Sequence, residues 1–168
     1  MRYIFSLVII MALSGAPAAL FAQNEKKEDQ SLDALADDLK FRNGVEFITL
    51  KMYDKALENF REYLEIYYNG THRDEAYRHI AEIYFRKLDY LKAVDNYRSL
   101  YEEFSTTESG IEAYFNMAIC YNKMGGSYDK KAAEIFNDII ENHPDSAFAQ
   151  QSRLQMDILN IMNDRQDK

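Results

Sequence analysis

The chain has 168 residues, 47% of them hydrophobic, and this length and composition fit a single domain with a packed core. Six glycines and two prolines provide few turns, which argues against a sandwich or barrel of short strands and favours helices. The net charge of -8 opposes nucleic-acid binding, and a single cysteine, Cys120, excludes an internal disulfide and a Cys-based zinc site.

The first 22 residues have the three-part organisation of a signal peptide. Arg2 precedes an apolar stretch over residues 3–13, and small residues follow up to Ala22. Cleavage after Ala22 is preferred, with cleavage after Ala18 as the second choice. An uncleaved inner-membrane anchor is the alternative, because about 20 apolar residues can span a bilayer. We therefore expect an exported chain that works in the periplasm.

Two short segments separate this leader from the rest of the chain. Residues 23–30 are polar and charged, which indicates a solvated linker. Within residues 31–39, one helical stripe is formed by Leu32, Leu35, Ala36 and Leu39, and it is too short to specify a coiled coil. We expect this stripe to extend the first helix and to cover the open end of the fold, with a short coiled coil as the alternative.

The chain then repeats itself at an interval of 37 residues, which lengthens to 39 in the third unit. Each unit carries two small residues, and these form the pairs Gly44 and Ala56, Ala81 and Ala93, and Ala118 and Ala132. The two extra residues of the third unit lie in a predicted turn at 125–127. Apolar side chains follow a 3.6-residue period twice in each unit, with a break between. Each unit is thus predicted to be a helical hairpin whose small residues meet at the closest approach of the two helices.

Local chemistry marks several helix limits. Asn69-Gly70 predicts a helix stop, because both residues tolerate the left-handed conformation. The spacing of Ser105 and Glu108 is that of a capping box. Pro144 ends the third unit, and Ser146 is placed to cap the helix that follows.

The second unit shows the motif most clearly: a small residue at Ala81, an aromatic at Tyr84, Tyr-x-Lys-Ala over residues 90–93, and an aromatic at Tyr97. This pattern resembles the tetratricopeptide repeat. The resemblance covers residues 37–146 and implies an all-α fold: an α-solenoid of three such hairpins plus a C-terminal closing helix. The repeat domain is expected over residues 31–162, with a polar tail at 163–168.

The units are longer than the usual 34 residues of the family. With His143-Pro144-Asp145-Ser146, they are similar to the longer variant found in bacterial envelope proteins such as BamD and CpoB (YbgF). The chain has no lipidated cysteine to match BamD, and its coil segment is shorter than that of CpoB.

The resemblance implies that the first helix of each hairpin lines the concave side of a curved stack. It places the inward positions at Phe41, Val45, Ile48, Arg78, Glu82, Phe85, Phe115, Ile119 and Asn122, with Arg86 and Lys123 one residue further. We expect this groove to hold an extended or helical segment of a protein partner, with Phe41, Phe85 and Phe115 as anchors and the cations pairing with acidic groups. The alternative is that the apolar residues pack against the N-terminal extension or the closing helix.

Two weaker candidates concern metal binding. Asp38, Glu75 and Glu112 recur every 37 residues, but each is predicted in a first helical turn, where the helix dipole favours an anion. His72 and His79 are seven residues apart and lack a third ligand at fitting spacing.

The sequence therefore predicts a non-enzymatic scaffold or adaptor of the cell envelope that binds a protein or peptide, uses no cofactor, and meets the membrane only through a complex. Outer-membrane protein assembly and Tol-Pal or cell-division coordination are the processes that the family resemblance suggests. The alternatives are a metal-dependent binder or enzyme using the carboxylates and His72/His79, and a membrane-anchored oligomeric adaptor. The partner and the oligomeric state do not follow from the sequence.

Overall fold

The computed structural model describes residues 15–166, with side chains described for residues 32–162. Most of the expected signal peptide, residues 1–14, lies outside the described residues. Among residues 15–166, none of the helices combines the length and the hydropathy that crossing a membrane requires.

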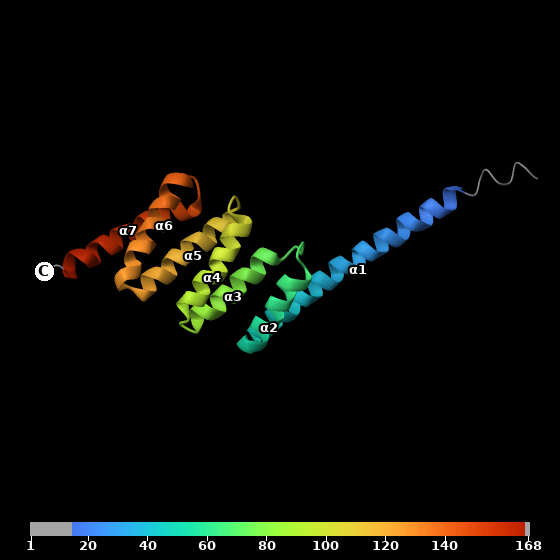
Figure 1. Cartoon of the computed structure of the whole chain (residues 1–168), viewed down its shortest axis with the longest axis horizontal. Coiled ribbons are helices and arrows are strands. Elements are labelled where there is room, and N and C mark those ends of the chain that lie inside the picture. Colours follow the sequence, from blue (N-terminus) through green and yellow to red (C-terminus); the bar gives the residue numbers. More distant parts are fainter. Residues whose placement is uncertain (1–14, 167–168) are drawn as a thin grey trace, which may run out of the picture.

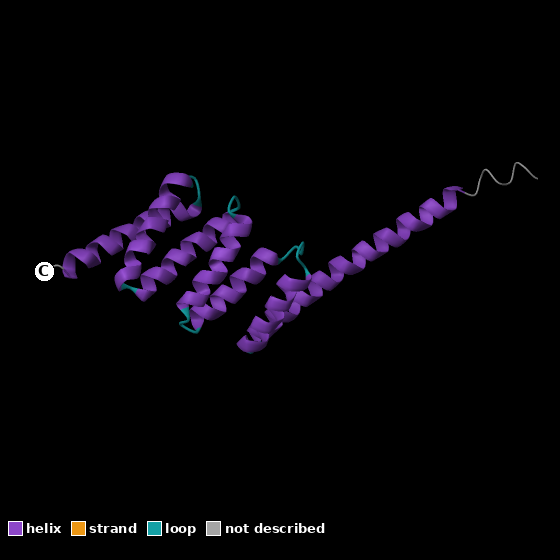
Figure 2. Cartoon of the chain, in the orientation of Figure 1, coloured by secondary structure: helices purple, strands orange, loops and turns teal. Residues whose placement is uncertain are grey.

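Helices build the whole of the described chain, with short turns between them and no strand in residues 15–166 (Figure 2). They are α1 (Gly15–Thr49), α2 (Tyr53–Ile66), α3 (Arg73–Arg86), α4 (Tyr90–Phe104), α5 (Glu108–Met124), the 3-10 turn η2 (Gly126–Tyr128), α6 (Asp129–Asn142) and α7 (Ala147–Gln166). Helices α1 to α6 form three consecutive hairpins, and α7 closes the stack (Figure 1). The predicted all-α solenoid is confirmed.

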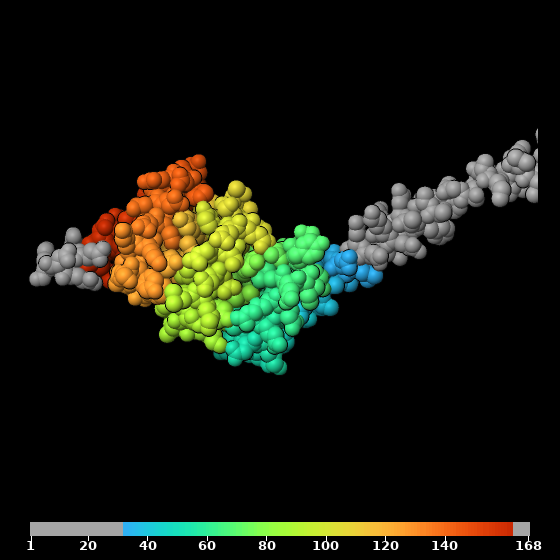
Figure 3. Space-filling view, viewed as in Figure 1, coloured from blue at the N-terminus to red at the C-terminus, as the bar shows by residue number. Residues whose placement is uncertain are grey.

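The hairpins follow one another along the long axis of the molecule (Figure 3). Each helix packs on the helix before it and the helix after it, and α5 also touches α3 and α7. Among the described residues, the even-numbered helices make fewer contacts with one another than these odd-numbered helices do. Phe41 of α1 also contacts His72 and His79, so the odd-numbered helices α1, α3, α5 and α7 lie next to one another. We call these four helices the inner layer.

The core lies where the predicted small residues meet. Ala56, Ala93 and Ala132 are completely buried, as are Ala81 and Ala118. The interaction at Gly44 differs from the predicted pairing of small residues, because its closest neighbour is the ring of Phe60. A Cβ atom added to Gly44 would lie 2.5 Å from Phe60 Cε1, so the ring occupies the space that the missing side chain leaves.

One inter-hairpin contact recurs with the period of the sequence. Arg61 on α2 donates to the Tyr84 hydroxyl on α3, and Arg98 on α4 donates to the Tyr121 hydroxyl on α5 at 3.2 Å. Both pairs join the second helix of a hairpin to the first helix of the next. Since both members recur after 37 residues, the stacking register of the hairpins is repeated in the sequence.

Several predicted boundaries need correction. α2 ends at Ile66 rather than at Asn69-Gly70, and the N-cap of α5 is Thr107, whose hydroxyl accepts from Gly110 N, rather than Ser105. Residues 23–30, expected as a linker, are helical within α1, because Glu, Lys and Gln are good helix formers. The predicted turn at 125–127 is confirmed by positive φ angles at Gly125 and Gly126, and Ser146 does cap α7 by accepting from Phe148 N at 3.1 Å.

The stripe on α1 does not cover the end of the stack as expected. Leu32, Leu35 and Leu39 are 63%, 62% and 56% exposed. α1 packs on α2 only from about Asp37 onward, where its side chains begin to be buried. The preceding part of α1 extends away from the hairpins (Figure 1), which leaves the leucines uncovered by any described element.

Candidate functional site

Two of the expected anchors, which occupy equivalent positions in the first and third hairpins, are buried. Phe41 on α1 is 6% exposed, and its ring stacks on His72 with centroids 4.4 Å apart. Phe115 on α5 is 7% exposed and lies 5.4 Å from the ring of Phe148. In both cases the start of the next inner helix covers the ring. The prediction that Phe41 and Phe115 are open anchors is therefore wrong. Phe115 instead packs against the closing helix, which was the alternative.

The equivalent position of the second hairpin holds Arg78. Its guanidinium nitrogen Nη1 lies 3.8 Å from Glu112 Oε2 on α5, and its Nε is buried without a hydrogen-bond partner among the described residues. The side chain is 30% exposed. Arg78 therefore lies at the surface of the inner layer, where a partner can approach it.

The other expected groove residues are accessible to different degrees. Half-buried ones are Val45, Ile48, Glu82, Phe85, Ile119 and Asn122, whereas Arg86 and Lys123 are exposed. Phe85 packs edge-on against Tyr90 of α4, with centroids 5.3 Å apart, and keeps part of its ring open. The inner layer thus presents partly open apolar side chains beside exposed cations.

Glu82 brings negative charge into the middle of this surface. His79 Nδ1 lies 3.4 Å from Glu82 Oε2. This hydrogen bond lowers the pKa of Glu82, burial opposes the shift, and the nearby charges of His79, Arg78 and Arg86 lower it further. Glu82 is therefore ionised at neutral pH and partly offsets the cations around it.

The two histidines pack against the first hairpin, His72 on α1 and His79 on α2. His72 lies under Phe41 with its Nε2 3.5 Å from Asp38 Oδ1, and His79 packs on Phe60 at 5.3 Å between centroids. Within the described part of the chain, no three His, Cys, Asp or Glu side chains are grouped so that they could hold a metal ion.

The carboxylates that recur every 37 residues do not share one helical position. Asp38 lies inside α1, which begins at Gly15, and Glu112 lies beyond the first turn of α5, so only Glu75 is in a first turn. The helix-dipole explanation is correct for Glu75 alone.

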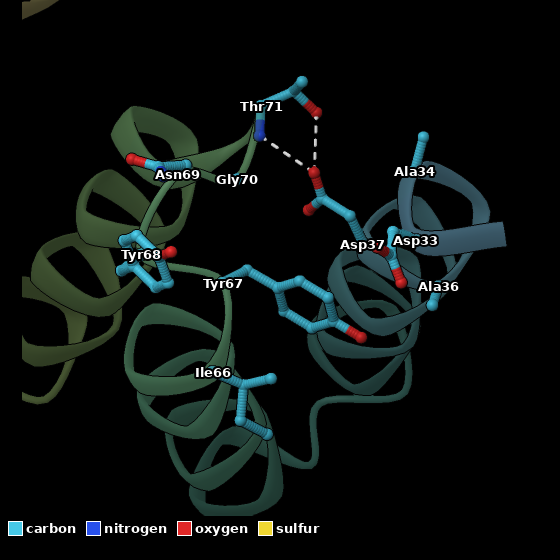
Figure 4. A pocket seen from close by; sticks show the side chains of 10 residues that line it. All are labelled: Asp33, Ala34, Ala36, Asp37, Ile66, Tyr67, Tyr68, Asn69, Gly70 and Thr71. Carbon is cyan, nitrogen blue, oxygen red and sulfur yellow. Dashed lines mark hydrogen bonds between the residues drawn. The ribbon is translucent and has the colours of Figure 1, made fainter. Parts of the chain in front are cut away.

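The sequence did not reveal the role of Asp37, a 6% exposed carboxylate on α1. It accepts a hydrogen bond from the Tyr63 hydroxyl. Figure 4 shows the two bonds that it accepts from Thr71, from N at 2.9 Å and from Oγ1 at 3.1 Å. Burial alone raises the pKa of Asp37, but these bonds and the nearby His72 outweigh it and hold the pKa below its usual value. Asp37 therefore fastens α1 to the loop between α2 and α3.

A cleft of roughly 590 Å³ lies beside this carboxylate, between α1 and the α2–α3 loop. Figure 4 shows Asp33 and Ala36 on one wall and residues 66–71 on the other. Both oxygens of Asp37 are already bonded within the chain, so this carboxylate holds the two walls of the cleft together. Only the composition of the loop, Asn69-Gly70-Thr71, hinted at a turn here.

Cys120 is fully buried in α5, and burial raises the pKa of its thiol to about 12. A thiol that remains protonated at neutral pH is a poor nucleophile, so Cys120 is a packing residue.

Two curated relatives share part of this sequence. The photosystem I assembly protein Ycf3 of a Synechococcus species is 32% identical over 85 residues, which are 51% of this chain and 47% of that protein. Ycf3 of Prochlorococcus marinus is 31% identical over 104 residues, covering 55% of this chain and 58% of that protein. The chain spans about half the length of the curated relatives it matches. These relatives are not of the BamD or CpoB type, so the envelope variant stays a prediction.

A family model described as tetratricopeptide repeat matches residues 112–146, which include most of α5, all of α6 and the turn before α7. Repeats of this kind generally bind protein partners. The third hairpin of this chain is therefore a tetratricopeptide repeat.

Proposed function

We propose that the chain is a non-enzymatic adaptor that holds a segment of a protein partner along the inner layer of the stack. The observation that carries this proposal is the run of half-buried apolar side chains along α1, α3 and α5, next to the exposed cations Arg86 and Lys123. Apolar side chains that remain partly open provide contact area, and the cations select acidic groups.

The revised groove differs from the one expected from sequence. Phe41 and Phe115 no longer serve as anchors, whereas Phe85 keeps that role. The half-buried aliphatic side chains of Val45, Ile48 and Ile119 join it. Asn122 and Glu82 add hydrogen-bonding groups between them. A segment with alternating apolar and acidic residues fits this surface.

We propose further that this adaptor assists the assembly of a multi-subunit complex. The Ycf3 relatives are named as assembly proteins of photosystem I, which supports an assembly role for this chain. The leader over residues 1–22 supports work outside the cytoplasm, in the periplasm. Outer-membrane protein assembly and Tol-Pal coordination are the envelope processes suggested by the resemblance to longer repeats.

Site-specific photo-crosslinking in the native cell tests the inner layer. A photoreactive residue at position 86 or 123 should yield a crosslinked partner, whereas one at the exposed Glu102 of α4, on the outer layer, should not. Equal yields from both layers, or none from the inner layer, would reject the groove.

A double variant, Phe85→Ala with Arg86→Glu, measures the contribution of the groove. It should abolish the position-123 crosslink while the denaturation midpoint falls only slightly, because neither side chain is fully buried. The control Leu91→Ala with Lys92→Glu makes the same kinds of change at two exposed residues of α4 and should leave the crosslink intact.

A further inference from the structure

The closing helix α7 follows the same register as the inner helix α5. The N-caps Thr107 and Ser146 are 39 residues apart, so each residue of α7 has an equivalent on α5 that lies 39 residues earlier. The face of α7 that includes Ala149, Ser152 and Leu159 is buried, as are the equivalent positions of α5. The exposed positions of α7 form two further faces, and these differ in chemistry.

The first of these faces is polar. On α5, Ala118 and Tyr121 are buried, and Lys131 of α6 lies over the Tyr121 ring. Their equivalents on α7 are Asp157 and Asn160, which are both exposed. In the described part of the chain no second helix follows α7 to cover this face, and polar side chains suit a face that stays in water. This face therefore ends the stack.

The second face is apolar although it is also exposed. Its members are Leu154, Ile158, Ile161 and Met162, which are 60%, 41%, 54% and 50% exposed. We call these four residues the α7 strip. In the 39-residue register their equivalents on α5 are the groove positions Phe115, Ile119, Asn122 and Lys123. The large exposed apolar side chains of α7 are thus confined to the positions that continue the groove.

Equivalent positions of neighbouring inner helices form rows across the groove. One row consists of Arg86 on α3, Lys123 on α5 and Met162 on α7, which are 37 and 39 residues apart. The three helices follow one another along the stack, and α5 touches both α3 and α7 (Figure 1). This row changes from two cations to an apolar side chain. The groove therefore has a basic part on α3 and α5 and an apolar end on α7.

The charge of the basic part is not balanced within the described residues. The two glutamates of the groove interact within the chain, because Glu82 lies 3.4 Å from His79 and Glu112 lies 3.8 Å from Arg78. The two cations of the row are exposed and form no ion pair with another residue in the range 32–162. Positive charge thus remains open here in a chain of net charge -8, and acidic side chains of a partner complement it.

We propose that the partner segment has two parts: acidic side chains that face Arg86 and Lys123, and an apolar cluster that packs on the α7 strip. This inference rests on the proposed function and defines the chemistry of its partner. Neighbouring helices lie about 10 Å apart, and an extended chain rises about 3.3 Å per residue. An extended segment that crosses the inner helices therefore carries acidic residues about three positions apart, with the apolar cluster about three positions beyond them.

Mapped photo-crosslinks in the native cell test this arrangement. A photoreactive residue at position 123 reports on the basic part. One at the exposed Gln151, which shares a helical face with Leu154 and Ile158, reports on the α7 strip. Both should attach to the same partner, at sites within about ten residues of each other, with acidic residues near the first site and apolar residues near the second. A photoreactive residue at Asn160, on the polar face, should not attach to it.

The outcomes separate this inference from the proposed function. A crosslink from position 123 without one from position 151, two sites in distant parts of the partner, or equal capture from position 160 would overturn the two-part segment and leave the groove standing. No crosslink from positions 123 and 151 would reject both.

A synthetic peptide of the mapped segment measures the two parts separately, by fluorescence anisotropy with the mature chain. Leu154→Gln should raise the dissociation constant about tenfold, as expected for the loss of one buried leucine, and leave its salt dependence unchanged. Lys123→Gln should instead reduce the salt dependence. The matched control Leu91→Gln, at a 53% exposed leucine on α4, should bind like the wild type. Equal weakening by the two leucine variants, no weakening by Leu154→Gln, or a wild type that does not bind the peptide would contradict the proposal.

Discussion

The junction between the first and second hairpins and the junction between the second and third differ at one repeat position. Phe41 is buried under His72 where the first hairpin meets the second, whereas Arg78 stands 30% exposed at the same position one repeat later. A buried aromatic ring contributes more to stability than a partly exposed ion pair. The backbone register is thus the same at both junctions, but the first junction stabilises the fold and the second leaves charge available to a partner.

Removing the ring at the first junction should have the largest effect. Phe41→Ala takes away contacts with Phe60, Tyr63 and His72 and leaves a cavity, which costs about 3–5 kcal/mol. Urea denaturation measures the loss. Phe85→Ala, at a half-buried ring of the same inner layer, should cost clearly less; equal losses would contradict the difference between buried and open positions.

Removing the buried carboxylate of Asp37 near the first junction should have the second largest effect on stability. Asp37→Ala leaves the Tyr63 hydroxyl and Thr71 N without their acceptor, which costs about 1–3 kcal/mol. Asp33→Ala is the matched control, because Asp33 is an exposed carboxylate on the same helix and the same cleft. It should change stability by less than about 0.5 kcal/mol. A comparable loss in both variants would argue against a specific stabilising role of the Asp37 hydrogen bonds.

Acid should weaken the first junction through the same carboxylate. Burial raises the pKa of Asp37, and its hydrogen bonds with Tyr63 and Thr71 more than reverse that shift. An Asp whose pKa is lower in the folded than in the unfolded state, where it is about 3.9, stabilises the fold above that pH; this stability is lost as the pH falls through the folded-state pKa. Thermal midpoints followed from pH 6 to pH 2 should therefore decline, and less steeply in Asp37→Asn. An equally steep decline in that variant would assign the acid sensitivity to other groups.

The ion pair of the second junction should matter least to folding. Arg78→Met keeps the apolar stem and removes a charge whose Nε has no partner among the described residues, so stability should stay within about 0.5 kcal/mol of wild type. A double-mutant cycle with Glu112→Gln, read by urea denaturation, should give a coupling below about 1 kcal/mol. A loss like that of Phe41→Ala would show that both junctions are structural.

Much of the fold follows from periodicity. The spacing of Ala56, Ala93 and Ala132 predicts the hairpins, and all three residues are buried in the structure. The closing helix and the turn at 125–127 also follow from local patterns. Helix ends such as that of α2 were placed less well, since a Gly in a loop marks a turn without fixing the last helical residue.

The candidate site was predictable only in part. The inner helices are identified by the repeat, but the exposure of each inward residue depends on what the next hairpin puts beside it. Phe41 and Phe115 look like open anchors in the sequence, and they are buried because His72 and Phe148 lie over them.

The helical hairpins follow from the amino-acid sequence, because helix formation and helix pairing depend on neighbours within about 40 residues and recur with the apolar period. Contacts between the units determine the Asp37–Thr71 hydrogen bonds, the burial of Phe115 and the exposure of Leu154 on α7. Burial is a property of the finished stack: Phe115 is 7% exposed because Phe148 lies over it, whereas Leu154 on the last helix is 60% exposed.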